Sequence, residues 1–294
     1  MTDRPSPTIR RRRLGAELRR YREAAGITIE GAAAHLACST SKISRIETGH
    51  NSATPRDVAR LLERYGVSGH VATELVDIAQ QARQKGWWHP YSAVLTGAYV
   101  GLEAAASSVQ AYEQQVVPGL LQTHEYARAM IRAARPDISS DEVERRVRVR
   151  LGRQSLLTQD DPLSFWVVLD EAVVSRPVGG DAVMRTQIDR LVTAADLPHV
   201  TLQLLPFSVG GHAGMDGTFA ILGFPGPHDP DVVYAENATG GLFLEKSEEL
   251  RKYNIIFQEI GAAALSPEES VAQLGKLAKE PLWNSSRPRD SGST

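Results

Sequence analysis

Cysteine, aromatic residues and long apolar runs are all scarce in this sequence of 294 residues. The single cysteine, Cys38, excludes an intramolecular disulfide and a cysteine-based metal cluster, and it suits a reducing compartment. No apolar run approaches the roughly eighteen residues of a membrane-spanning helix, and the basic first residues have no apolar segment behind them. We therefore expect a cytoplasmic protein without a signal peptide or a membrane span.

Known catalytic motifs are missing as well. The sequence has no Walker loop, nucleophile elbow, dinucleotide-binding glycine fingerprint or HExxH motif. Hydrophobic residues make up 42% and charged residues 23%, which excludes collagen and a wholly disordered chain. The length suits two domains. We expect no catalytic site, no metal and no cofactor.

Charge is divided unevenly along the chain, although the formal net charge is only −2. Residues 1–70 hold 13 Lys and Arg against 7 Asp and Glu, whereas residues 71–294 hold 20 against 28. A basic module on an acidic body is the asymmetry expected when one end of a protein binds a polyanion.

Helical periodicity and capping residues predict a mainly α, five-helix N-terminal bundle followed by a larger α+β domain. The expected segments are a flexible arm over 1–9, a helical domain over 10–85, a linker over 86–100, an α+β domain over 101–282 and a disordered tail over 283–294. The helices of the bundle are predicted at Arg10–Ala25, Ile29–Ala37, Ser41–Thr48, Arg56–Tyr65 and Val71–Lys85.

In the second domain, strands cluster after residue 198, which is typical of an α+β fold. The predicted helices are Leu102–Gln114, His124–Ala134, Asp141–Leu157, Ala182–Ala194, Lys246–Ile260 and Pro267–Lys279. The predicted strands are Phe165–Leu169, Val200–Leu205, Phe219–Phe224, Val232–Glu236 and Leu242–Leu244.

Residues 28–49 carry the pattern of a helix-turn-helix. Ala33 is the small residue needed where the two helices cross, and Ile43 and Ile46 supply inward apolar positions on the second helix. The other face of that helix combines short hydroxyl side chains with one long cation, which suits base edges and phosphates in a major groove. Its members are Thr40, Ser41, Ser44, Arg45 and Thr48.

This stretch resembles the phage-repressor-like, XRE-type helix-turn-helix family, most specifically in Ile43-Ser44-x-Ile46-Glu47-x-Gly49. The resemblance implies a five-helix bundle that presents its third helix to DNA. The turn departs from the family, with Ala37-Cys38 where glycine is common. The implied contacts are base-reading at Thr40, Ser41 and Arg45, phosphate-bordering at Ser39, Lys42 and Ser44, and backbone-holding at Thr48 and Asn51.

Four consecutive arginines, Arg10, Arg11, Arg12 and Arg13, begin the first predicted helix. Positive charge there opposes the helix dipole, so these residues are poorly placed for helix stability alone. They suit a phosphate or a minor groove, with a solvated basic arm as the alternative. A purely structural or protein-binding bundle is the alternative to DNA binding for the whole module.

Phrases spread over residues 100–275 are similar to the C-terminal domain that follows an XRE-type helix-turn-helix in many actinobacterial regulators. That family is described as antitoxin-like and related to WhiJ-type regulators, and its genes often lie beside one for a small partner protein. The resemblance implies regulation and names no ligand. The matching phrases are VVPGLLQTHEYARAMI, DEVERRVRVRLGRQSLL, PLSFWVVLDEAVVSRPVGG, VTLQLLPFSVGGHAGMDGTFAILGFP, DPDVVYAE and LSPEES.

Three further segments of the second domain invite functional interpretation. The glycine-dense stretch Gly210–Gly217 is the candidate binding loop, because glycines permit close approach of a partner. Asp170 and Glu171 are adjacent in an extended chain and so form a poor acid–base pair, and Glu171 is expected to begin a turn or a helix. The arginine-rich Asp141–Leu157 is better explained by a solvated or dimer-facing helix than by a second DNA contact. The expected partner or effector contacts are Gly211, His212, Gly214 and Met215.

These observations predict a sequence-specific transcriptional regulator that binds double-stranded DNA through the helix at residues 40–48. One short helix reads too few base pairs for genomic specificity, so a homodimer on a two-fold symmetric operator is expected. The second domain would control binding through a protein partner or small effector. Two alternatives stay open: an antitoxin-like protein that sequesters a small partner and autoregulates its operon, and an enzyme using His212 or Glu171.

Overall fold

The computed structural model describes residues 7–49, 51–82, 97–225, 229, 231–237 and 240–280. They divide into two compact units with the main border between Ala105 and Ala106. Residues 1–6 of the expected arm, residues 83–96 around the expected linker and the whole expected tail lie outside the described residues.

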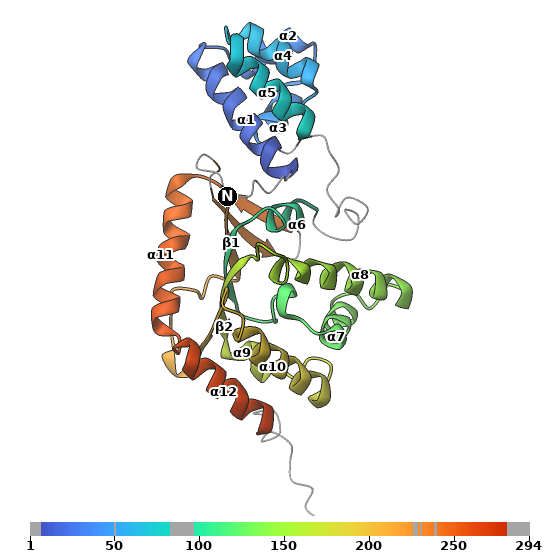
Figure 1. Ribbon diagram of the computed structural model, residues 1–294, viewed down its shortest axis with the longest axis vertical. Helices are drawn as coiled ribbons and strands as arrows, with labels where there is room; N and C mark the ends of the chain where they lie inside the picture. The colour runs from blue at the N-terminus through green and yellow to red at the C-terminus, as the bar shows by residue number, and fades with distance from the viewer. Residues whose placement is uncertain are drawn as a thin grey trace, which may run out of the picture. The chain divides into compact units, whose positions relative to one another are not determined.

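The N-terminal bundle contains the five expected helices (Figure 1): α1 (Pro7–Ala24), α2 (Ile29–Leu36), α3 (Thr40–Glu47), α4 (Pro55–Arg64) and α5 (Gly69–Gln81). The side chains of Thr28, Ser39 and Thr54 cap α2, α3 and α4, each accepting a hydrogen bond of 3.0–3.2 Å from a backbone N–H three residues on. α1 starts at Pro7, three residues before its predicted start. One apolar core, which includes Leu18, Ile46 and Leu61, holds these helices together.

A mixed sheet of six described strands forms the centre of the second unit, in the order β3-β2-β1-β4-β5-β6. The strands are β1 (Ser108–Glu113), β2 (Ser164–Asp170), β3 (Val200–Leu205), β4 (Phe219–Gly223), β5 (Val232–Asn237) and β6 (Gly240–Leu244). β1, β2 and β3 are parallel, whereas β4 runs antiparallel to β1. The connection from β3 to β4 therefore passes over the carboxyl ends of β2 and β1.

Helices cover both faces of this sheet (Figure 1). α11 (Ser247–Ala263) packs Phe257 and Ile260 against Tyr112, Val168 and Phe219 on one face. Figure 1 shows α7 (His124–Ala134), α8 (Ser140–Gly152) and α10 (Asp181–Ala195) on the other side. The remaining elements are α6 (Gly97–Glu103), α9 (Glu171–Ser175), α12 (Pro267–Lys279) and the 3-10 helices η2 (Gly119–Leu121), η3 (Arg153–Leu157) and η4 (Phe207–Val209).

The helix predicted at Leu102–Gln114 is wrong. Its second half contains β1, an inner strand of the sheet, and only its first two residues are helical, because α6 ends at Glu103. Gln110, Ala111 and Glu113 have little intrinsic β propensity, but pairing with β2 on one side and β4 on the other overrides that preference. The predicted helix Asp141–Leu157 also divides, because α8 ends at Gly152 and η3 follows. The helix predicted at Val71–Lys85 ends at Gln81, with residues 83–85 outside the described residues, and α6 begins within the linker expected over 86–100. The remaining predicted helices and strands agree in type and place.

Candidate nucleic-acid interface

The helix-turn-helix of α2 and α3 rests on buried apolar side chains. Ala33 is 4% exposed, while Ile43 and Ile46 are 1% and 2% exposed, as the sequence pattern predicts. α1 crosses the end of α3 so closely that a Cβ at Gly15 would collide with the carbonyl oxygen of Ile46. The apolar face of α3 is therefore fixed against the bundle, and its polar face is turned away from the core.

That polar face carries five exposed residues: Thr40, Ser41, Ser44, Arg45 and Thr48. Within the described residues Arg45 has no ion-pair partner, so its guanidinium is available to an incoming ligand. Thr48 donates its hydroxyl hydrogen to the carbonyl oxygen of Ser44 over 2.8 Å. The arrangement offers hydroxyl donors and acceptors beside one long cation, which matches the chemistry of base edges and phosphates.

Other residues expected at the interface already have structural roles. Ser39 is the N-cap of α3, and the backbone N–H of Asn51 donates to the carbonyl oxygen of Arg45 over 2.9 Å. The ammonium of Lys42 lies 3.0 Å from a carboxylate oxygen of Asp57 in the first turn of α4. Sequence reasoning missed Asp57, because no spacing rule connects residues fifteen positions apart on different helices.

The four arginines of α1 do not form one exposed row. Arg13 is exposed and its guanidinium lies 3.5 Å from Glu74 of α5. Arg10, Arg11 and Arg12 are half-buried. Arg12 packs against the end of the helix-turn-helix, since a Cβ at Gly49 would lie 2.6 Å from its Cγ.

A buried ion pair ties α3 to α1. Glu47 accepts two hydrogen bonds from the guanidinium of Arg22, at 2.6 and 2.9 Å, and Arg22 also donates to the carbonyl oxygen of Ile27 at 2.9 Å. Both charged side chains are less than 10% exposed. This bidentate geometry fixes the end of α3 relative to α1. The only sequence signal for it was Glu47 inside the family-like motif.

In the second unit, the candidate binding loop lies over the carboxyl ends of the parallel strands. Met215 is 67% exposed and Gly211 is also exposed, whereas His212 and Gly214 are largely enclosed. A Cβ at Gly214 would lie 2.5 Å from the ring of Tyr112. The four expected contact residues therefore separate into two that face solvent and two that anchor the loop.

The anchor is a hydrogen-bond chain. Gly214 donates its N–H to Nδ1 of His212 over 3.2 Å, and the other ring nitrogen lies 3.4 Å from the hydroxyl of Tyr112. Burial raises the pKa of Tyr112 to about 12, so its hydroxyl stays protonated and donates to Asp170 over 3.4 Å. The chain joins the loop to the ends of β1 and β2.

Asp170 and Glu171 serve separate structural roles. The carboxylate of Asp170 caps α9 by accepting the N–H of Ala172 at 2.8 Å. Glu171 begins that helix, which is one of the two forms expected there, and accepts the N–H of Phe207 at 2.7 Å. The two adjacent carboxylates therefore accept from different backbone N–H groups.

Two arginines of the arginine-rich helix α8 pair with a carboxylate of the same helix. Arg145 and Arg146 both pair with Glu142 at 2.8 Å, while Glu144 pairs with Arg128 of α7 at 2.9 Å. These pairs neutralise part of the positive charge of α8. They are compatible with the expected solvated or dimer-facing helix.

A second charged cluster lies between the sheet and the end of α8. Glu113 keeps some exposed surface, but its carboxyl group is enclosed, and burial together with the negative charge of Glu236 raises its pKa to about 8. Burial and the neighbouring Arg153 lower the pKa of Arg150 to about 10. Arg150 donates to the side-chain oxygen of Gln122 over 3.1 Å.

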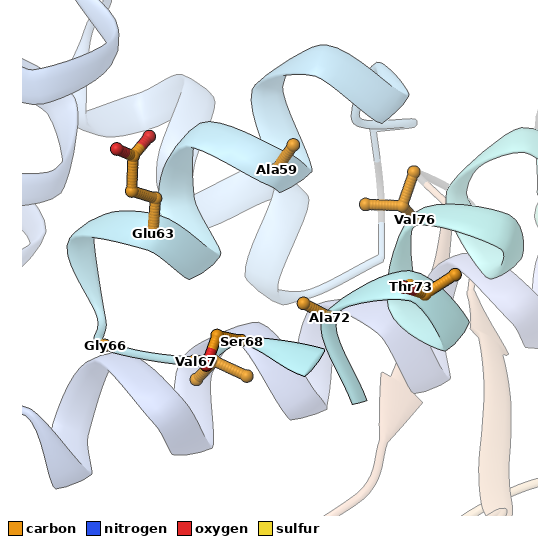
Figure 2. Close-up of a pocket in the computed structure, with 8 residues that line it drawn as sticks. All are labelled: Ala59, Glu63, Gly66, Val67, Ser68, Ala72, Thr73 and Val76. Atoms are coloured by element: carbon orange, nitrogen blue, oxygen red, sulfur yellow. The ribbon is translucent and has the colours of Figure 1, made fainter. Parts of the chain in front are cut away.

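A shallow groove of about 580 Å³ lies between α4 and α5. Figure 2 shows its lining, which is composed of small side chains with Glu63 as the one charged member. The lining residues are Ala59, Glu63, Gly66, Val67, Ser68, Ala72, Thr73 and Val76. None of them belongs to the polar face of α3.

The part of the chain that the structure describes brings no three His, Cys, Asp or Glu side chains together as metal ligands. None of its helices combines the length and apolar character that crossing a membrane requires.

Two family models match the chain. One is described as "Helix-turn-helix domain" and matches residues 13–75. The other is described as "Domain of unknown function (DUF5753)" and matches residues 96–276, which is more than half of the chain. Searches of curated proteins and of solved structures found no match.

Proposed function

Because this chain belongs to the family described as "Domain of unknown function (DUF5753)" and begins with a helix-turn-helix domain, we propose that it is a sequence-specific transcriptional regulator. The observation that carries the proposal is the polar face of α3. There the exposed Arg45 lies beside hydroxyl side chains and has no ion-pair partner within the described residues. A major groove admits a helix of this kind, and an arginine there discriminates guanine from other bases.

In the proposed complex, α3 lies in the major groove of double-stranded DNA. Thr40, Ser41 and Arg45 read base edges, and Thr48 with Asn51 holds the backbone at the helix end. Phosphates are contacted by two groups of residues: Ser39, Lys42 and Ser44 on α3, and Arg10, Arg11, Arg12 and Arg13 on α1. The basic balance of residues 1–70 supports this assignment.

The second unit is proposed to control DNA binding rather than to catalyse a reaction. Its exposed Gly211 and Met215 would contact a protein partner or small effector, with His212 and Gly214 holding the loop in place. We further propose that the protein is cytoplasmic and related to WhiJ-type regulators. We also propose that it binds a two-fold symmetric operator as a homodimer, because one recognition helix reads too few base pairs for genomic specificity.

In-vitro selection from random duplex DNA with the purified full-length protein tests the proposal. An enriched two-fold symmetric motif is the expected outcome. An enriched motif without symmetry would keep the DNA-binding function and remove the dimer. If no sequence is enriched and a small protein co-purifies in equal amount from the native host, the antitoxin-like alternative replaces the regulator.

A further inference from the structure

The two cationic side chains of α3 differ in whether they form an ion pair. Arg45 is exposed and has no ion-pair partner among the described residues. Lys42 lies three residues earlier on the same helix, and its ammonium lies 3.0 Å from the carboxylate of Asp57. The pair joins α3 to the first turn of α4, so the Lys42 side chain is directed by an element outside the helix-turn-helix.

Asp57 is a firmly held partner for this ammonium. Its backbone N–H donates to the cap hydroxyl of Thr54 over 3.0 Å, and its side chain is only 19% exposed. A carboxylate in the first turn of a helix is favoured by the helix dipole. The position of this carboxylate at the start of α4 is therefore favoured independently of Lys42.

Lys42 can still contact DNA from this position. Its side chain is 42% exposed, and an ammonium has three N–H donors, of which Asp57 takes one. A phosphate would then meet an ammonium whose charge is already partly balanced. Fewer counterions would be released from the DNA than by a free lysine.

We propose that Asp57 is a positioning residue that weakens the contact of Lys42 with the DNA backbone and so raises the share of binding that depends on sequence. This inference rests on the proposed DNA-binding function. Phosphate contacts supply nearly all non-specific affinity, whereas Arg45 is assigned to base edges. A carboxylate that restrains Lys42 therefore lowers affinity for every sequence and leaves the base contacts unchanged.

The test is Asp57→Asn in the full-length protein, bound to a duplex of mixed sequence over a series of salt concentrations. The variant is expected to bind more tightly, and its salt slope is expected to steepen by about 0.9, the value of one added phosphate contact. The ratio of its affinity to that of the wild type should accordingly shrink about three- to fourfold between roughly 50 and 200 mM salt. An unchanged slope or weaker binding overturns the proposal.

Three further variants separate the local effect from a general change in charge. Asp57→Glu keeps the carboxylate and should retain the wild-type slope. Glu63→Gln removes an equal charge from the exposed side of the same helix and should leave the slope unchanged. In a Lys42→Gln background, Asp57→Asn should have no effect; an equal gain there would mean that Lys42 is not involved.

Thermal melting of each variant checks that the bundle remains folded. If Asp57→Asn unfolds, Asp57→Ser, which also removes the carboxylate, takes its place and should steepen the salt slope by the same amount. Failure of this inference is distinct from failure of the proposed function. If the wild-type protein binds no duplex at any salt concentration, the regulator itself is refuted. If the wild type binds and the Asp57 variants behave alike, only the role of Asp57 is refuted.

Discussion

Ala37 shows how a single residue can carry strain in a functional motif. It closes α2 with φ 53° and ψ 49°, in the left-handed region, and it is the non-glycine residue with a positive φ among the described residues. An L-residue pays about 1–2 kcal/mol for that conformation because its Cβ approaches the following carbonyl oxygen. The turn before α3 is thus less stable than the same turn with glycine.

We expect Ala37→Gly to raise the free energy of unfolding of the bundle by about 1 kcal/mol, since glycine adopts the left-handed region without this clash. Urea or thermal unfolding measures the change. The control is Ala34→Gly, an exposed position inside the same helix, which should lower stability by about 1 kcal/mol. Equal destabilisation by both variants would show that Ala37 is not strained.

Arg45 is the residue on which sequence discrimination should depend most. Arg45→Ala is expected to lose about 1–3 kcal/mol of binding to the selected operator and to relax the preference at one base position. Competition binding with operators changed at each position measures both effects. Arg13→Ala, at an exposed arginine of α1, should instead weaken all sequences to a similar extent. An operator affinity unchanged by Arg45→Ala would remove that residue from the base-reading set.

At the scale of single residues, the sequence predicts contacts between residues that are close together along the chain. The sequence offers Thr28, Ser39 or Thr40, and Thr54 as helix caps, because a cap side chain bonds to a backbone N–H three residues on. The structure has Ser39 rather than Thr40 as the cap of α3. The partner of Lys42 was not predictable, because it lies on another helix and its position depends on how α3 and α4 pack.

Among the elements, the connection between β3 and β4 has an anchored part and a free part. Gly214 packs closely against the ring of Tyr112 and the side chain of Ile260, because a Cβ at this position would lie 2.5 and 2.6 Å from them. A Cβ at Gly211 would have nothing within 4 Å. The loop is therefore constrained by sterics at Gly214 and open to solvent at Gly211.

Two matched substitutions test this division. Gly214→Ala should destabilise the second unit by about 1–3 kcal/mol, because the added methyl group overpacks a buried contact. Gly211→Ala should change stability by less than about 0.5 kcal/mol, since the site is open and its φ is not in the left-handed region. Thermal unfolding compares them, and equal stability of the two variants would contradict the anchored arrangement.

The elements also show where sequence reasoning failed. Helices with one apolar stripe, such as α7 and α10, were located from periodicity alone. β1 was mistaken for a helix because its residues favour helices locally and both of its sides are paired with other strands. The ion pair between Arg22 and Glu47 likewise depends on the crossing of α1 and α3, which no local pattern specifies.

At the scale of the whole molecule, the uneven distribution of charge along the chain follows its division into two compact units. The basic excess of residues 1–70 lies in the unit that carries the helix-turn-helix, and the acidic excess falls mainly in the other. The sequence was sufficient to predict this organisation, because composition and periodicity change together along the chain. It did not predict the charge cluster around Glu113, which forms only when β1, β5 and the end of α8 come together.

Glu113 should make the stability of the protein depend on pH near neutrality. Burial and the repulsion from Glu236 raise its pKa to about 8 in the folded state, whereas an unfolded chain restores a value of about 4.3. A raised pKa means that folding takes up a proton. The resulting stabilisation is complete below about pH 4 and is lost as the pH rises through about 8.

Glu113→Gln imitates the protonated acid at every pH and should remove this dependence. The variant and the wild type are expected to unfold at similar temperatures near pH 5, and the variant should melt about 3 °C or more above the wild type at pH 9. Melting curves between these pH values measure the difference. Glu259→Gln, at an exposed position on α11, should melt at the same temperature as the wild type at every pH in this range. A constant offset between wild type and Glu113→Gln across the range would show that Glu113 titrates normally, and that Arg150 and Arg153 offset its burial.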